Sequence, residues 1–299
     1  METTVSVFCS VSNREISDLE SWLIPSLMSQ KKIARIELYL INYTGSDERI
    51  YTGERQRGIV TIGEINKGSA CGFGEAHNFA FNTVNPAPYF MIVNPDVYLH
   101  ELCVSELTTK IRQDEQYALV EARQLPYQHP KEYDPETGET PWASGCCIMV
   151  KADFFRAVGG FDELFWMYAE DVDLSWRAWL AGFRVVYHPP AVVYHYTGYY
   201  FSYNPYRFYI EHFWCVRNYL YMLYKYWGWR GMRRGIRIVK KQNFPAGFKD
   251  LVIKSFLELK DAIPAGTFLE YRRGVKRHTD RIMVAGFNQY NKQNMAQDV

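Results

Sequence analysis

Three carboxylates, Glu170, Asp171 and Asp173, lie close together in an otherwise aromatic stretch that begins with FWMY at 165–168. A short helical pattern places them near a helix N-terminus, where acids complement the helix dipole. That effect accounts for one or two acids. Acids among aromatic rings are costly to desolvate and are typical of sites that use a base with a shifted pKa. We therefore predict a general base in this segment.

A second set of residues has the chemistry of a cation site. Asn94-Pro95-Asp96 follows the apolar run YFMIV, and His195 ends the strand-like run 191–195. A simple turn at Pro95 and a structural role for a lone His are the alternatives. Mg²⁺ and Mn²⁺ take one or two carboxylates together with phosphate oxygens. Asp96, completed by His195, is thus the candidate ligand for a cation that holds a diphosphate.

A glycine-rich loop, GSACGFG at 68–74, follows a predicted strand and precedes a predicted helix. Such a loop lets the backbone approach a phosphate or base closely. It matches neither the dinucleotide-binding glycine pattern nor a phosphate-binding lysine loop, so a plain tight turn is an equal alternative.

The elements that must position these residues alternate along the chain. Apolar runs predict strands, and helical spacing predicts the segments between them. The predicted strands are 3–11, 36–43, 59–65, 89–94 and 117–122, and the predicted helices are 17–28, 76–82 and 102–112. This alternation predicts an α/β fold with a Rossmann-like, mostly parallel sheet flanked by helices. Ligands of such sheets bind at the carboxyl ends of the strands, where polar and glycine residues gather here.

Composition excludes several classes of function. The net charge of +1 over 299 residues argues against nucleic acid as a partner. The six Cys include no CxxC pair, so we expect reduced thiols rather than a zinc or redox site. The N-terminus reads directly into a strand, and no apolar run is long enough to span a bilayer. We expect a cytoplasmic protein, soluble or attached to the inner face of the plasma membrane.

The order of these motifs carries a resemblance. INYTGSD, NKGSACGFGEAHN, NPDV, GGFDELFWMYAEDVDLSWR and HPPAVVYH follow one another over roughly residues 4–225. This order resembles the family 2 glycosyltransferases of the GT-A fold, in particular their rhamnosyltransferase-like branch. The resemblance implies an inverting transferase that uses a nucleotide-diphosphate sugar and Mn²⁺ or Mg²⁺. The QxxRW motif of processive synthases is absent, which favours transfer of a single sugar.

The resemblance also implies roles for individual residues. Asp47 matches the residue that reads the donor base, Asp171 the catalytic base, and His195 a ligand of the metal or diphosphate. Asn94 replaces the first Asp of the family's metal motif, so Asp96 would bind metal largely alone. With the strand-end residues, the predicted donor-binding set is Ser12, Asn13, Asn42, Asp47, Asn66, Lys67, Gly68, Gly72, Asn78 and Asn94. The predicted acceptor contacts are Trp166, Tyr168 and Glu170, with core packing as the alternative for the two aromatic rings.

The pattern changes after residue 203. Residues 225–260 carry ten Lys or Arg against two acids, with aromatic residues between them. We therefore predict a catalytic GT-A domain at 1–203 and a helical basic extension at 204–299. Basic residues interleaved with Trp and Phe are typical of an anionic membrane surface. Packing on the core, or contact with a second copy of the chain, is the alternative.

The predicted function is transfer of one sugar to a glycan or polyprenyl-linked acceptor in cell-surface polysaccharide synthesis. The resemblance favours rhamnose from dTDP-rhamnose, with UDP-hexoses and galactofuranose left open. The alternative is a non-catalytic GT-A-like subunit that binds nucleotide or glycan within an assembly complex.

Overall fold

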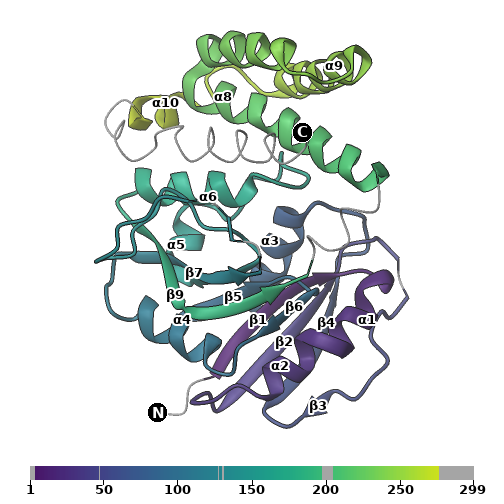
Figure 1. The fold of residues 1–299 in the computed structure, drawn as a ribbon, viewed down its shortest axis with the longest axis vertical. Coiled ribbons are helices and arrows are strands. Elements are labelled where there is room, and N and C mark those ends of the chain that lie inside the picture. The colour runs from purple at the N-terminus through teal and green to yellow at the C-terminus, as the bar shows by residue number, and fades with distance from the viewer. Residues whose placement is uncertain (1–3, 47, 127, 130, 197–204, 276–299) are drawn as a thin grey trace.

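A computed structural model describes residues 4–46, 48–126, 128–129, 131–196 and 205–275 (Figure 1). Its centre is a nine-stranded sheet with the order β3-β4-β2-β1-β5-β8-β7-β9-β6. The strands are β1 (Thr4–Val11), β2 (Arg35–Asn42), β3 (Gln56–Arg57), β4 (Val60–Asn66), β5 (Tyr89–Val93), β6 (Val97–Leu99), β7 (Tyr117–Leu125), β8 (Cys147–Lys151) and β9 (Arg184–His195).

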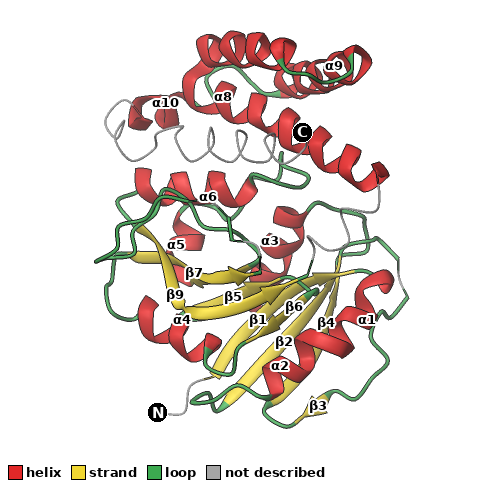
Figure 2. Ribbon diagram, viewed as in Figure 1, coloured by secondary structure: helices red, strands yellow, loops and turns green. Residues whose placement is uncertain are grey.

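The sheet has four neighbouring parallel strands in one half, with the short edge strand β3 antiparallel to β4, and is mixed in the other half. Strands β4, β2, β1 and β5 run parallel, as the alternation of strands and helices predicted. Strand β8 enters antiparallel between β5 and β7, and the edge strand β6 is antiparallel to β9. The predicted α/β class with flanking helices is confirmed (Figure 2), and the antiparallel strands are the departure from a mostly parallel sheet.

Helices cover both faces because alternate residues of each strand point to opposite sides. In β1, Val7 and Cys9 belong to one hydrophobic cluster and Phe8 to the other. The first cluster is covered by α1 (Ile16–Asp18), the π-helical turn η2 (Leu19–Leu23), α2 (Ile24–Met28) and α4 (Cys103–Ile111). The 3-10 helix η1 (Asn13–Glu15) precedes α1. The second cluster is covered by α3 (Phe73–Val84), α5 (Ala152–Ala157) and α6 (Glu170–Leu180).

Three further helices lie as a layer over α6: α8 (Pro205–Lys241), α9 (Ala246–Ala262) and α10 (Leu269–Val275) (Figure 1). Helix α8 bends at Gly228, whose φ of 63° and ψ of −150° are not helical. The hydrophobic cluster beneath α6 continues into this layer through Tyr226, Phe256 and Phe268. The predicted boundary at 203/204 lies outside the described residues.

Most aromatic residues of the basic segment pack inward. Phe256 is fully buried, and Trp227 and Phe244 pack against the same cluster. The sequence placed them as candidate membrane contacts because residue type alone does not reveal which face of a helix they share. Trp229 is the one that remains at the surface, 58% exposed. No helix among the described residues is both long and apolar enough to cross a bilayer.

Candidate active site

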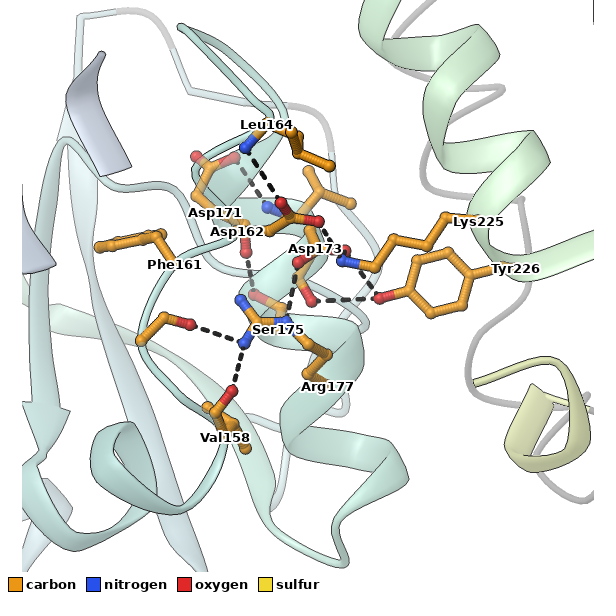
Figure 3. A network of polar contacts seen from close by, with 12 residues as sticks. Val158, Phe161, Asp162, Leu164, Asp171, Asp173, Ser175, Arg177, Lys225 and Tyr226 are labelled. Carbon is orange, nitrogen blue, oxygen red and sulfur yellow. Dashed lines mark hydrogen bonds and ion pairs between the residues drawn. The ribbon is translucent and has the colours of Figure 1, made fainter. Parts of the chain in front are cut away.

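The three clustered carboxylates occupy three different environments. Asp173 is completely buried and forms an ion pair with Arg177 Nε (2.8 Å) and with Lys225 Nζ (2.6 Å). The Tyr226 hydroxyl also donates to it (2.8 Å; Figure 3). Burial favours its protonated form, but the charges of Lys225 and Arg177 outweigh burial and hold the pKa of Asp173 below its usual range. Asp173 is therefore a structural residue that joins α6 to α8.

Asp171 is the carboxylate with the geometry of a base. It stays partly exposed in the first turn of α6. Its Oδ2 accepts a hydrogen bond from the Gly145 backbone N–H (2.9 Å), and its Oδ1 accepts one from Val172 N–H (2.8 Å). Burial raises the pKa of Asp171, and these two N–H groups oppose the shift in part. The side chain is thus held in one orientation, with acceptor capacity left for a substrate proton.

Glu170 is a buried acid. The side chain lies in the buried first turn of α6, and its Oε2 has no hydrogen-bond partner among the described residues. Burial, together with the charge of Asp171, raises the pKa of Glu170 well above its usual range. Because a neutral carboxylic acid donates a proton rather than accepting one, Glu170 is unsuited to be the base.

The turn before α6 is backbone-strained and closely packed. Tyr168 and Ala169 both have φ of 69°, in the left-handed region that non-glycine residues rarely adopt. The Phe73 N–H donates to Trp166 O (2.9 Å), and a Cβ on Gly72 would lie 2.3 Å from that oxygen. Gly72, predicted to bind donor, is therefore required here for a close approach between two loops. Trp166 itself is 41% exposed beside this turn.

The predicted cation ligands lie together where β6 and β9 meet. His195 Nε2 is 3.3 Å from Asp96 Oδ1, and Val97 pairs with His195 across the two strands. His195 Nδ1 is 3.1 Å from Gln124 Oε1, which only accepts, so Nδ1 carries a proton and Nε2 points toward Asp96. Burial lowers the pKa of His195, but Cys146 and Asp96 outweigh it and raise the pKa to about 10.

A carboxylate and an imidazole together fit a hard divalent cation that takes its remaining ligands from a diphosphate. Among the described residues, no group of three or more His, Cys, Asp or Glu could hold a metal ion. A cation at Asp96 and His195 would therefore depend on donor oxygens, and it would replace the proton on Nε2.

One short segment joins the predicted base to the predicted cation ligands. Gly145 N–H binds Asp171, and the next residue, Cys146, accepts a hydrogen bond from Asn94 N–H through its carbonyl (2.9 Å). The residues predicted from distant parts of the sequence are thus brought to one end of β8. No sequence motif pointed to Gly145, because a backbone N–H leaves no residue-type signal.

Several predicted donor residues shape the loops at the strand ends. Asn42 is buried; its Oδ1 accepts from Thr44 N–H (3.1 Å), and its Nδ2 donates to Ser46 O (2.9 Å). Asn66 Nδ2 donates to the same carbonyl (2.9 Å). These bonds fix the loop that leads to Asp47, which itself lies outside the described residues.

The remaining predicted donor residues divide between surface and interior. Asn13 and Gly68 are exposed, and Ser12 is partly exposed with its hydroxyl bonded to Glu15. Lys67 pairs with Glu75 (2.6 Å) at the start of α3.

Asn78, by contrast, is buried. It donates to Phe161 O (2.9 Å) and accepts from Phe161 N–H (2.8 Å), and it also donates to Glu163 (2.9 Å). Its amide groups thus hold the loop before α6 in place.

Other important side chains had no motif to reveal them. Lys131 forms a buried ion pair with Glu121 and donates to Trp142 O (3.1 Å), just before the Gly145 segment. In α8, Arg217 and Lys225 are buried at helical spacing on an apolar face. A charged residue inside a buried stripe is the only signal that the sequence offered for them.

The fold is similar to those of several solved glycosyltransferases. No family model matches the chain. It superimposes on the mannosyltransferase PcManGT of Pyrobaculum calidifontis, solved with GDP-Man and Mn²⁺, with a TM-score of 0.55 and 12% identity over 100% of this chain and 89% of that one. For Staphylococcus aureus TarS 1–349 the TM-score is 0.53 and the identity 13%, over 97% of this chain and 82% of that one. For GalNAc-T7, solved with UDP, GalNAc and Mn²⁺, the TM-score is 0.54 and the identity 13%, over 93% of this chain and 55% of that one.

The chain thus has the GT-A fold of nucleotide-sugar glycosyltransferases. A 65-residue stretch is 45% identical to the Mycobacterium tuberculosis N-acetylglucosaminyl-diphospho-decaprenol L-rhamnosyltransferase, covering 22% of this chain and 21% of that protein. A 68-residue stretch is 38% identical to the Escherichia coli rhamnosyltransferase WbbL, covering 23% of this chain and 26% of that protein. The match therefore spans about a fifth to a quarter of these relatives. The predicted resemblance to rhamnosyltransferase-like glycosyltransferases is confirmed.

Proposed function

We propose that this protein is an inverting glycosyltransferase that moves one sugar from a nucleotide-diphosphate donor to a glycan or polyprenyl-linked acceptor. The observation that carries the proposal is the single short segment that joins Asp171 to Asn94 and Asp96. Inversion needs a base on one side of the anomeric carbon and charge stabilisation of the leaving diphosphate on the other. Rhamnose from dTDP-rhamnose is the donor we favour, because the similar stretches belong to rhamnosyltransferases.

In this mechanism Asp171 takes the proton of the acceptor hydroxyl as that oxygen attacks the anomeric carbon. The Gly145 N–H keeps the carboxylate aimed at one place during the attack. Asp96 and His195 would hold Mn²⁺ or Mg²⁺, which neutralises charge on the departing diphosphate. Trp166 would contact the acceptor through its exposed ring. Glu170, predicted as a second acceptor contact, is buried beneath the first turn of α6 and does not present its carboxyl group to an acceptor.

The test is transfer or hydrolysis across a panel of nucleotide sugars, with and without Mn²⁺. We expect dTDP-rhamnose to be consumed only with metal, and proton NMR of the product to show the inverted anomeric configuration. Binding of a nucleotide sugar without turnover of any donor, in the presence of a lipid-linked acceptor, would favour the non-catalytic alternative. A product of retained configuration would refute the inverting mechanism.

The cation assignment gives a separate prediction. Asp96→Ala should weaken Mn²⁺-dependent binding of the donor nucleotide diphosphate by about 10- to 100-fold, and His195→Ala should weaken it less, because the carboxylate is the harder ligand. Calorimetry with dTDP in Mn²⁺ and in EDTA measures both values. In EDTA, both variants should bind dTDP with the wild-type affinity. Unchanged affinity of both variants in Mn²⁺ would remove these residues from the cation site.

We also propose that the second half of α8 attaches the protein to anionic lipid on the cytoplasmic face of a membrane. Residues 228–241 contain no acid. Their exposed cations share the helix surface with Trp229, and they are Arg230, Arg233, Arg234, Arg237, Lys240 and Lys241. The guanidinium carbons of Arg230 and Arg233 lie 5.6 and 5.7 Å from the Trp229 ring centroid. An exposed Trp among cations is suited to the headgroup region.

Changing Arg230, Arg233 and Arg234 to Gln should therefore reduce binding to phosphatidylserine vesicles about 100-fold at low salt. Each cation near such a surface contributes about 1 kcal/mol, and added salt screens it. The matched control changes Lys31, Lys32 and Arg35, exposed cations near the start of β2, and should leave vesicle binding unchanged. Vesicle co-sedimentation measures both. A wild-type protein that ignores anionic vesicles at low salt would contradict the attachment.

A further inference from the structure

The strained turn before α6 is held by α8. Asn218 of α8 is completely buried, and its Nδ2 donates to Met167 O (2.7 Å) and to Tyr168 O (2.7 Å). Both hydrogens of this amide therefore bind carbonyls of the segment in which Tyr168 and Ala169 adopt positive φ. The side chain comes from a helix about fifty positions further along the chain, in the layer above α6 (Figure 1).

The orientation of the Asn218 amide is itself fixed. Arg217 Nη1 donates to Asn218 Oδ1 (2.6 Å) and to Leu164 O (2.8 Å). Because the guanidinium only donates, the amide oxygen must face Arg217 and the nitrogen must face the turn. The turn is contacted from its other end by Phe73 N–H, which donates to Trp166 O. Its carbonyls are thus bonded from two elements that are remote in sequence.

Asp171 lies two residues after this turn. Its carboxylate can act as the base only in the orientation in which it accepts the hydrogen bond from Gly145 N–H. Left-handed backbone at two consecutive non-glycine residues is unfavourable and persists only when the surroundings impose it. A relaxed turn would shift the start of α6, and a misplacement of about 1 Å in a catalytic group can cost on the order of 100-fold in rate. We infer that Asn218 is a positioning residue, which sets the base Asp171 by holding the left-handed turn at Tyr168 and Ala169. This inference rests on the proposed transferase function.

The test compares Asn218→Ala with a control on the same helix. Leu220 is equally buried, but it packs toward the second half of α8, where a Cβ on Gly235 would lie 2.9 Å from its Cδ2. We expect Asn218→Ala to lower kcat about 10- to 100-fold, with the KM for donor unchanged, because two hydrogen bonds to the turn are lost. Leu220→Ala should lower the unfolding midpoint but leave kcat within about twofold.

Rescue separates positioning from general destabilisation. Glycine adopts positive φ without strain. Ala169→Gly in the Asn218→Ala background should therefore recover a large part of kcat, although it restores no lost contact. If Asn218→Ala does not fold, Asn218→Ser, which keeps one donor, replaces it in both arms. A kcat within twofold of wild type, or no recovery with Ala169→Gly, would overturn the inference.

Amide hydrogen exchange measures the stability of the turn without relying on enzymatic activity. The amides of residues 167–171 should exchange faster in Asn218→Ala and at the wild-type rate in Leu220→Ala. If the wild-type protein transfers no sugar, the proposed function fails, while faster exchange still shows that Asn218 holds the turn. If the wild-type protein is active and exchange in Asn218→Ala is unchanged, the positioning inference alone fails.

Discussion

Asp171→Asn should lower kcat for sugar transfer by about 10²- to 10⁴-fold while donor affinity remains near the wild-type value. General-base removal has an effect of this size, because the acceptor hydroxyl then attacks without losing its proton in the transition state. Asparagine keeps the shape of the side chain and one oxygen to accept the Gly145 N–H, and it loses only the bond from Val172 N–H, so the rest of α6 should remain as in wild type. Single-turnover kinetics and nucleotide-sugar binding measure the two quantities separately.

The pH profile gives the same prediction a second readout. Burial raises the pKa of Asp171 in the folded protein. Since only the ionised carboxylate accepts a proton, wild-type kcat should fall as pH drops through this raised pKa. The residual activity of Asp171→Asn should not show this fall of kcat at low pH. Asp153→Asn, an exposed acid of α5, is the matched control and should retain wild-type kcat and pH dependence. Near wild-type turnover in Asp171→Asn would mean that another group is the base.

Lys225→Met should destabilise the fold by about 3–5 kcal/mol, the usual effect of removing one partner from a buried ion pair. The Lys225 side chain is 2% exposed, and its Nζ lies 2.6 Å from both Asp162 and Asp173 (Figure 3). Methionine fills the space of the aliphatic stem but leaves the buried Asp173 and the partly buried Asp162 without that charge. Arg177 continues to pair with Asp173, so Asp162 bears much of the loss.

Urea unfolding followed by circular dichroism measures this loss as a lower midpoint at an unchanged slope. Lys254→Met is the matched control: Lys254 lies on the surface of α9, 3.9 Å from Glu258, and the change should stay within about 0.5 kcal/mol. Adding Asp162→Asn to Lys225→Met should recover part of the stability by removing the uncompensated charge. A loss below about 1 kcal/mol for Lys225→Met would show that the ion pair contributes little net stability.

The sequence by itself determined most elements of the N-terminal half of the sheet and the chemical types of the candidate site, but not strand β8 or helix α5. Apolar runs and helical spacing are local properties, so they indicated the parallel half of the sheet and the helix that begins at Glu170. Asp96 and His195 were recognisable because strand ends of an α/β sheet converge at one edge. The same reasoning could not foresee that β8 enters antiparallel, since strand direction depends on a long connection rather than on the residues of the strand.

Tertiary structure decided which of the clustered acids has the geometry of a base. Glu170, Asp171 and Asp173 are alike in type and spacing, yet their surroundings differ. Glu170 is buried with an Oε2 that has no hydrogen-bond partner among the described residues, Asp171 accepts from Gly145 N–H, and Asp173 pairs with Arg177 and Lys225. Their differences come from partners remote in sequence. The roles of Asn218 and Lys225 were hidden for the same reason. The pKa and orientation of a carboxylate depend on burial, charge and hydrogen bonds supplied by elements that only the folded chain brings into contact.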